Sequence, residues 1–357
     1  MQNNDKETLL QNLIKSTAKW TNGQGPLSDV VVSSRIRLAR NIENIPFPAR
    51  ACQAELKNVF ELIQKVIAKN PIFNDTNLIL LNNLSPLENQ FLVEKNLISS
   101  YFAREKYPYR AFIYNKEETL SIMVNEEDHI RIQSLNSGLQ LNKIWKFINK
   151  IDDEIEKKVT YAFNEKEGYL TSCPTNVGTG MRASVMLHLP ALVIVNRVKE
   201  LLKAISKIGY VVRGFYGEGS EAMGDLFQIS NQVTLGISEE ETIDNLEKVS
   251  RNIIDQEQKA RKKLALGTKS ELEDRIWRAY GLLSSARIIS SMEAMELLSK
   301  LRFGVELEII SNFNLSKLNK LILLIQPAYL RMLYGEELDA FKRDLQRATL
   351  IRNEVSR

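Results

Sequence analysis

The chain has 357 residues, of which 44% are hydrophobic and 26% are charged, and its formal net charge is +4. This is the composition of a globular protein long enough for two domains, without the run of about 20 apolar residues that spans a membrane and without the strong positive charge that would indicate nucleic-acid binding. Two cysteines and two histidines exclude a disulfide framework and make a protein-ligated transition metal improbable.

The N-terminal third contains a basic strand and a helix. The opening MQNNDKETLL has no apolar signal core, so we expect a cytoplasmic protein. Residues 28–41, SDVVVSSRIRLARN, join an apolar run to basic residues, which predicts a strand ending in an arginine-bearing loop. Arg35 and Arg37 alternate there and share one side if the segment is extended. Apolar residues at helical spacing from Leu56 to Ile67 predict an amphipathic helix.

The middle of the chain mixes strands and helices. Residues 119–134, TLSIMVNEEDHIRIQS, predict two short strands around an acidic run, or one bulged strand. A helix is expected from Val195 to Ile208, closed by Gly209. The segments VVRGFY and LFQISNQVTLG predict strands on either side of a glycine-rich loop, and a long helix follows around Ile243 to Ile254.

The last ninety or so residues are expected to be helical. Ser270 with Glu273, and Ser290 with Glu293, have the spacing of helix capping boxes. A helical stripe from Leu318 to Ile325 ends before Pro327. We therefore predict a lead-in (1–28), a catalytic domain (29–266) and a helical domain (267–357).

Five arginines stand next to predicted turns, and each has a glycine, serine or carboxylate nearby. A guanidinium binds phosphate oxygens through two hydrogen bonds and keeps its charge, so the set favours a polyphosphate ligand over a solvated basic surface. The chain has neither a P-loop motif nor the protein-kinase motifs. The five are Arg35, Arg37, Arg131, Arg182 and Arg213.

Two acidic groups are candidates for proton transfer. NEEDH contains Glu126, Glu127 and Asp128, and GEGSE contains Glu218 and Glu221. Carboxylates near a phosphate site can hold Mg²⁺, or can orient a cationic substrate and accept its proton. A guanidinium needs such a pair, because its pKa lies far above neutrality. The alternative for NEEDH is a solvated turn.

Cys173 lies in LTSCPTNVGTGMRASV, residues 170–185. The following proline holds it extended, Ser172 can donate a hydrogen bond to its sulfur, and neighbouring arginines favour the thiolate. An anionic sulfur can pair with a cationic substrate. The alternative is a buried structural cysteine, which is our prediction for Cys52.

Together these segments resemble the phosphagen (guanidino) kinase family, over roughly Asp29 to Ala260. Within the family the chain is most similar to the bacterial protein-arginine kinases, because it lacks a long N-terminal helical domain and ends in a helical extension. The resemblance implies an α+β fold with a largely antiparallel sheet flanked by helices, followed by a helical domain. It is carried by SSRIRLARN, NEEDHIRIQ, GYLTSCPTNVGTGMRASVMLHLP, RGFYGEGSE, FQISNQ and the C-terminal RDLQRA.

The resemblance also implies residue roles. Glu127 and Glu218 grip and deprotonate the guanidinium, and Cys173 is the family's active-site cysteine. Where close relatives carry a nucleotide-contacting histidine this chain has Asn96, so a weaker or altered nucleotide contact is expected there. A regulatory phosphoarginine-binding pocket is implied at Arg343, Asp344, Leu345, Gln346, Arg347 and Ala348. The ATP site is implied at Ser33, Ser34, Arg35, Ile36, Arg37, Arg131, Arg182, Ala183, Ser184, Val185, Met186, Arg213, Gly214, Phe215, Tyr216, Gly217 and Glu218.

The activity implied is phosphorylation of arginine side chains in proteins by ATP with Mg²⁺, which marks proteins for an AAA+ protease and regulates a heat-shock repressor. The implied partners are protein substrates, a zinc-binding activator, the AAA+ unfoldase ClpC, that repressor and a second copy of the chain, with no membrane and no nucleic acid. Two alternatives remain: a kinase for free arginine, and a phosphoarginine-binding adaptor without catalysis. The intact Glu127, Glu218 and Cys173 speak against the adaptor.

Overall fold

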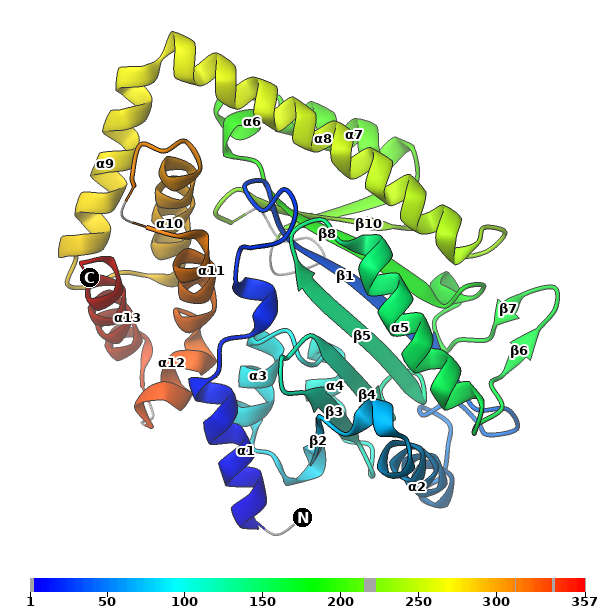
Figure 1. Cartoon of the computed structure of the whole chain (residues 1–357). Helices are drawn as coiled ribbons and strands as arrows, with labels where there is room; N and C mark the ends of the chain where they lie inside the picture. Colours follow the sequence, from blue (N-terminus) through cyan, green and yellow to red (C-terminus); the bar gives the residue numbers. More distant parts are fainter. Residues whose placement is uncertain (1–2, 215–222, 312, 336–337, 357) are drawn as a thin grey trace.

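The computed structural model describes residues 3–214, 223–311, 313–335 and 338–356. Its centre is an eight-stranded antiparallel sheet with the strand order β2-β3-β4-β5-β1-β8-β10-β9 (Figure 1). The predicted α+β class with a largely antiparallel sheet and a helical C-terminal region is confirmed. None of the helices described combines the length and apolarity that a bilayer span requires.

The strands of the large sheet are β1 (Val31–Arg40), β2 (Thr76–Leu80), β3 (Ala111–Asn115), β4 (Leu120–Val124), β5 (Ile130–Ser137), β8 (Met181–His188), β9 (Tyr210–Gly214) and β10 (Leu226–Asn231). A small hairpin, β6 (Phe163–Asn164) with β7 (Gly168–Tyr169), projects from one end of the sheet (Figure 1). The α-helices are α1 (Asn3–Lys15), α2 (Gln53–Lys69), α3 (Pro86–Glu94), α4 (Ser100–Arg104), α5 (Leu141–Glu156), α6 (Pro190–Ile194), α7 (Val198–Lys207), α8 (Glu239–Gly267), α9 (Lys269–Ser285), α10 (Ser291–Glu306), α11 (Leu315–Leu324), α12 (Pro327–Tyr334) and α13 (Ala340–Val355).

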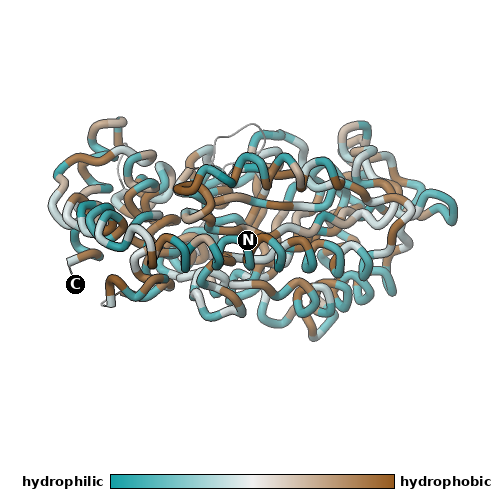
Figure 2. The backbone as a smooth tube through the Cα atoms, turned by 90° about the horizontal axis from the view of Figure 1, so that it is seen from above, coloured by the Kyte–Doolittle hydropathy of each residue, from teal (hydrophilic) through white to brown (hydrophobic). Residues whose placement is uncertain are grey.

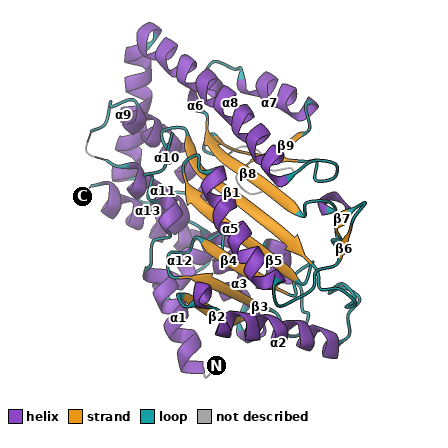
Figure 3. Ribbon diagram, turned by 45° about the vertical axis from the view of Figure 1, so that its right-hand side comes forward, coloured by secondary structure: helices purple, strands orange, loops and turns teal. Residues whose placement is uncertain are grey.

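Helices cover one face of the sheet, where α5 and α8 cross the strands (Figure 3). The apolar core between them holds Ile36 and Leu38 of β1 together with Ile144 of α5 and Ile253 of α8, all nearly inaccessible to solvent. A second core lies among α9 to α13, α1 and α3. In Figure 2 the hydrophobic segments lie largely inside and hydrophilic segments line much of the outer helices. Because side chains alternate along a strand, Arg35 and Arg37 of β1 are directed to the face opposite α5 and α8.

Most predicted elements are confirmed, with four corrections. The first strand continues through the basic segment, because β1 is hydrogen-bonded to β5 and β8 on both sides over Arg35 and Arg37. Cys52 is exposed at the start of α2 rather than buried. Ser270 lies inside α9 and caps nothing, since only Thr268 separates α8 from α9. The helix expected from Val195 begins at Val198.

Candidate active site

Four strands of the large sheet, β1, β5, β8 and the edge strand β9, carry the five predicted arginines. Arg37 of β1 is paired with Arg182 of β8, and Ala39 of β1 with Arg131 of β5. Arg35 lies two residues before Arg37, and Arg213 of β9 pairs with Gln228 of β10. Gln228 also accepts a hydrogen bond from the Arg35 guanidinium at 2.7 Å, so it connects Arg35 of β1 with the strand pair that carries Arg213. All five arginines lie within strands rather than in loops at strand ends, and we call them the arginine cluster.

The cluster is electrostatically strained. Burial, followed by the charges of Arg131 and Arg213, lowers the pKa of Arg35 to about 10. Burial and the other four arginines hold the pKa of Arg37 well below its ordinary value. Among the residues the structure describes, the Arg37 Nε is buried without a hydrogen-bond partner. Like charges gathered in this way favour the binding of an anion, and phosphate oxygens can accept from the unsatisfied Nε–H of Arg37.

Several side chains of the predicted ATP site lie on the face of the sheet that α5 and α8 cover. Ile36, Ala183 and Val185 are fully buried in the core beneath α5 and α8. The Ser34 hydroxyl is also buried and donates to the Gly138 carbonyl at 2.7 Å. Their side chains lie on the opposite face from the arginine cluster, so they shape the strands. Residues 215–218, which include the predicted Glu218, lie outside the described residues.

The acidic turn between β4 and β5 is largely buried, which removes the alternative of a solvated turn. Glu126 is inaccessible to solvent, accepts from the Arg131 guanidinium at 2.7 Å and accepts from the Ser99 hydroxyl at 2.5 Å. The backbone N–H of Glu127 donates to Glu126 at 2.9 Å. Glu126 therefore fixes Arg131 and the backbone of the next residue.

Glu127 has the properties of a proton acceptor. It is half-buried, and burial followed by the charges of Asp128 and Glu126 raises its pKa, against a smaller opposing effect of Arg131. A carboxylate with a raised pKa is a stronger base than a solvated one.

Asp128 connects this turn to the cysteine loop. Its Oδ1 accepts from the Ser172 backbone N–H at 2.6 Å and from the Asn41 amide at 2.7 Å. Asn41 in turn accepts from the backbone N–H of His129 at 2.9 Å. Asn41 directly follows β1, and no pattern in the sequence marks it as a site residue.

Cys173 is partly buried beside the acidic turn. The hydroxyl at its sulfur belongs to Thr175, 3.0 Å away, and not to Ser172, whose predicted contact is wrong. Pro174 begins a short 3₁₀ turn, which brings Thr175 back over the sulfur. The Thr171 hydroxyl donates to the Cys173 carbonyl at 2.8 Å, so both sides of the cysteine are anchored.

Comparison with known proteins identifies this arrangement. Residues 58–260, more than half of the chain, match the family model described as ATP:guanido phosphotransferase, C-terminal catalytic domain. The chain belongs to the ATP:guanido phosphotransferase family. Residues 269–357 match the protein-arginine kinase McsB C-terminal domain.

Relatives that match this phosphotransferase over nearly its full length are named protein-arginine kinase. A protein-arginine kinase of Pelotomaculum thermopropionicum is 48% identical over 352 residues, covering 98% of this chain and 99% of the relative. A protein-arginine kinase of Bacillus subtilis is 47% identical over 340 residues, covering 95% and 93%. The chain is thus an ATP:guanidino phosphotransferase.

Two solved structures of other kinases share the fold. A lombricine kinase superposes with a TM-score of 0.58 at 27% identity, covering 66% of this chain and 68% of that one. The duplicated taurocyamine kinase from Schistosoma mansoni gives a TM-score of 0.58 at 23% identity, covering 78% and 41%.

Asn96 of this guanidino phosphotransferase lies in a strained backbone position after α3. Its φ is 61°, in the left-handed region that asparagine tolerates better than most residues. Its carbonyl accepts from the Gln133 amide of β5 at 2.7 Å. Asn96 is therefore attached to the strand that carries Arg131.

The residues predicted to bind phosphoarginine lie on α13, and their arginines already have partners. Arg347 is buried and donates to the carbonyls of Ile325 and Ile289, each at 2.9 Å, and it pairs with Asp344. Arg343 donates to the Leu338 carbonyl at 2.9 Å. Arg347 thus turns inward, while Arg343 stays half-exposed.

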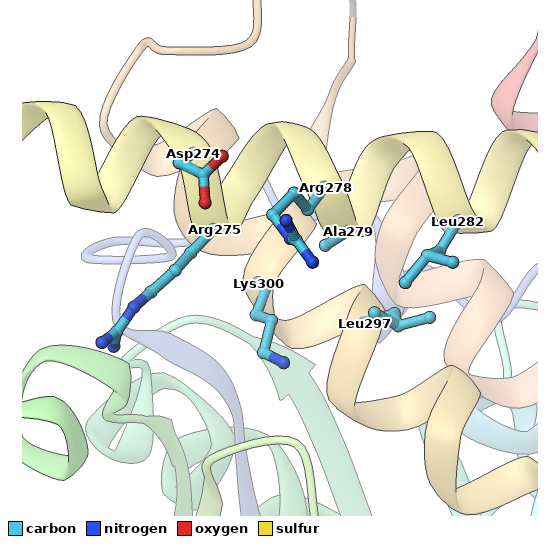
Figure 4. Close-up of a pocket in the computed structure, with 7 residues that line it drawn as sticks. All are labelled: Asp274, Arg275, Arg278, Ala279, Leu282, Leu297 and Lys300. Carbon is cyan, nitrogen blue, oxygen red and sulfur yellow. The ribbon is translucent and has the colours of Figure 1, made fainter.

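A cavity of about 310 Å³ lies elsewhere, between α9 and α10 (Figure 4). Figure 4 shows Arg278 of α9 and Lys300 of α10 near one another across it. None of the predicted site residues lines this cavity. The lining residues are Asp274, Arg275, Arg278, Ala279, Leu282, Leu297 and Lys300.

Proposed function

We propose that this enzyme transfers the γ-phosphoryl group of ATP to the guanidinium of arginine side chains in proteins. The observation that carries the proposal is the arginine cluster standing next to an acidic turn, with the cysteine loop tied to that turn by Asp128. Anion-binding and guanidinium-binding groups are thereby adjacent. The full-length relatives named protein-arginine kinase support proteins as the substrate class.

In this proposal the ATP phosphates lie against the arginine cluster and the substrate guanidinium lies between Glu127 and Cys173. A guanidinium nitrogen attacks the γ-phosphorus, the bond from that phosphorus to the bridging oxygen of ADP breaks, and the proton of the nitrogen passes to the Glu127 carboxylate. The residues act mainly by alignment and charge neutralisation, as in phosphoryl transfer generally. Glu218 is proposed, from the family resemblance, as the second carboxylate.

Mg²⁺ bound to ATP supplies additional neutralisation of the phosphate charge. Within the described part of the chain, no three His, Cys, Asp or Glu side chains group into a metal site. Mg²⁺ commonly keeps water and substrate phosphate oxygens as ligands, so this residue set is compatible with a metal carried by the nucleotide. The proposed cofactors are therefore ATP and Mg²⁺.

The decisive experiment separates protein substrates from free arginine. The enzyme is incubated with ATP and Mg²⁺ and with either an unfolded model protein or free arginine, and the products are analysed by mass spectrometry under conditions that preserve the acid-labile P–N bond. Phosphoarginine on the protein is the expected result. Phosphorylation of free arginine alone would make the enzyme a free-arginine kinase, and binding of phosphoarginine without transfer would make it an adaptor.

Cys173→Ser is expected to lower kcat about tenfold or more without unfolding the chain, because an uncharged hydroxyl replaces a polarisable sulfur next to the cationic substrate. The sulfur acts as an electrostatic partner, so no phosphocysteine forms. Turnover assays, thermal unfolding and intact-protein mass spectrometry check this. The exposed Cys52 offers a matched control, since Cys52→Ser should behave like wild type. A phosphoryl group trapped on Cys173 would contradict the role.

We also propose, from the resemblance, that α13 binds phosphoarginine through the six residues Arg343 to Ala348. Arg343→Ala with Arg347→Ala is expected to abolish phosphoarginine binding outside the active site while sparing catalysis. Arg347 supports two buried carbonyls, so Arg343→Ala alone is the second variant, because it leaves those contacts in place. Calorimetry with nucleotide-saturated enzyme measures the binding, and Lys342→Ala on the exposed side of α13 is the control. Equal binding by the variants and wild type would remove the pocket from this helix.

The cellular role follows the same resemblance. We place the enzyme in the cytoplasm as a homodimer or larger oligomer, divided into the three parts 1–28, 29–266 and 267–357. Its products are substrates for an AAA+ protease with the unfoldase ClpC, a heat-shock repressor is a regulated target, and a zinc-binding protein is the activator. The match of residues 269–357 to the protein-arginine kinase McsB C-terminal domain supports the bounds of the third part.

A further inference from the structure

A buried polar network joins α10 to the end of the sheet. The ring of His188, the last residue of β8, lies 2.9 Å from the Ser299 hydroxyl through Nε2 and 3.3 Å from the Glu306 carboxylate through Nδ1. His188 and the Glu306 side chain are inaccessible to solvent, and Ser299 is 5% exposed. Ser299 and Glu306, which lie on the same face of α10, therefore both contact the His188 side chain of the large sheet.

The network continues to the residues directly before β10. The Ser299 hydroxyl donates to the Asp225 carboxylate at 2.6 Å. Asp225 has a φ of 54° and Gly224 a φ of 60°, both left-handed. A Cβ on Gly224 would lie 2.8 Å from the Met295 carbonyl oxygen of α10, so the backbone here packs closely against the helix. The start of β10 is thus fixed on α10 rather than on the sheet alone.

β10 carries this constraint to the arginine cluster. Leu226, its first residue, pairs with His188. Three residues after Asp225, roughly 10 Å along an extended strand, Gln228 accepts from Arg35 and pairs with Arg213. Every step between Ser299 and the cluster is a described contact or a hydrogen-bonded strand.

Further ion pairs make the junction rigid. Glu306 accepts from the Arg302 guanidinium at 2.7 Å and lies 2.9 Å from Arg261 of α8. Burial acts to raise the pKa of Glu306, but the charges of His188, Arg261 and Arg302 hold it below its ordinary value. Arg302 also donates to the Ser28 carbonyl at 2.8 Å, just before β1. A buried group with this many partners has a single arrangement, because each lost contact leaves a polar atom unsatisfied.

We infer that Ser299 is a positioning residue for phosphoryl transfer, and that α10 is a component of the catalytic unit rather than part of a separable regulatory domain. Ser299 holds Asp225, Asp225 holds the start of β10, and β10 sets the positions of Gln228, Arg35 and Arg213. The inference rests on the proposed binding of ATP by the arginine cluster. It assigns to residues 267–357 a catalytic contribution in addition to the proposed phosphoarginine site.

The test uses the full chain and three substitutions. Ser299→Ala and Asp225→Gly each remove the hydrogen bond, and glycine keeps the left-handed backbone without strain. Asp225→Asn keeps an acceptor oxygen for the Ser299 hydroxyl and also tolerates positive φ. We expect Ser299→Ala and Asp225→Gly each to lower kcat about tenfold. This is less than the roughly 10²-fold loss that a 1 Å misplacement of reacting groups can cause. The double variant should be no worse than either single one, and Asp225→Asn should retain activity.

Lys300→Ala is the matched control, because Lys300 follows Ser299 on α10 but lines the cavity facing α9 (Figure 4). Its kcat should equal that of wild type. Assays are run well below each variant's Tm, and calorimetry gives the Kd for ADP with Mg²⁺, which we expect Ser299→Ala to raise several-fold.

An unchanged kcat and ADP Kd in Ser299→Ala, with only a lower Tm, would overturn the inference and leave a structural role. Additive losses in the double variant would overturn it equally. If wild type binds ADP but phosphorylates no arginine, the proposed function fails, and the ADP Kd values alone decide the inference. If wild type binds no ADP, both fail.

Discussion

Glu127→Gln is expected to reduce kcat by about 10² to 10⁴-fold, the contribution of a positioned general base. Glutamine keeps the size of the side chain and can accept a hydrogen bond, but it cannot take the proton that the attacking nitrogen loses. ATP binding should be nearly unchanged, because Glu127 belongs to the acidic turn and not to the arginine cluster. Rapid-mixing assays of phosphoarginine formation and calorimetry with ADP measure the two quantities separately.

The pH dependence gives the same prediction a second readout. Glu127 must be deprotonated to act, and burial with the charges of Asp128 and Glu126 raises its pKa. The wild-type rate should therefore fall as the pH is lowered, and the fall should begin at a higher pH than an ordinary glutamate would give. In Glu127→Gln this acid limb disappears. A wild-type rate that is independent of pH on the acid side contradicts the assignment.

The substitution should not destabilise the fold, because it removes one of three adjacent negative charges. Glu117→Gln is the control: Glu117 is an exposed carboxylate in the turn between β3 and β4, paired only with Lys19 among the described contacts. Its rate should equal the wild-type rate. Comparable losses in both variants would indicate a nonspecific effect of charge.

Short-range patterns predicted much of this fold. Alternation between strand faces correctly placed Arg35 and Arg37 on one side, and apolar spacing located α2. The strand order places β1, β5, β8 and β9 in one sheet. It depends on pairings between distant segments, which local periodicity does not encode. The five arginines themselves favoured a polyphosphate ligand, and the family resemblance then specified that ligand as ATP.

The supporting contacts were largely hidden for the same reason. Asn41 and Ser172 are 131 residues apart in the chain, and both meet Asp128. Thr175 reaches Cys173 only because Pro174 begins a turn, so the nearest hydroxyl in sequence was the wrong choice. The contact between Ser299 and His188 joins α10 to β8, and the sequence patterns of these two elements predict a helix and a strand without indicating that they touch. Buried polar partners are selected by tertiary geometry, and a single sequence indicates only their chemical types.

Arg37→Met is expected to have opposite effects on stability and on function. Methionine is shorter than arginine but keeps an unbranched apolar stem, and it removes one positive charge from among Arg35, Arg131, Arg182 and Arg213, which already depress the pKa of Arg37. The unliganded enzyme should therefore melt at a higher temperature than wild type, since the repulsion and the unpartnered Nε are both gone. ADP affinity should fall about 10- to 100-fold, because a charge-assisted hydrogen bond contributes roughly 1.5–3 kcal/mol.

Thermal unfolding with and without nucleotide measures both effects in one experiment. Nucleotide at a hundred times its Kd stabilises a protein by about 2.7 kcal/mol, so wild type should show a clear rise in Tm with ADP, and Arg37→Met should show a much smaller one from a higher starting point. Arg251→Met provides the control, because Arg251 is exposed on α8 and paired with Glu247. Its Tm and its ADP response should match wild type. A lower unliganded Tm for Arg37→Met together with a wild-type ADP response would show that Arg37 supports the fold and does not bind phosphate. If the arginine cluster is the nucleotide site, repulsion among its five positive charges destabilises the unliganded enzyme, and bound nucleotide relieves that repulsion. Removing one charge should therefore raise the unliganded Tm and lower the ADP affinity.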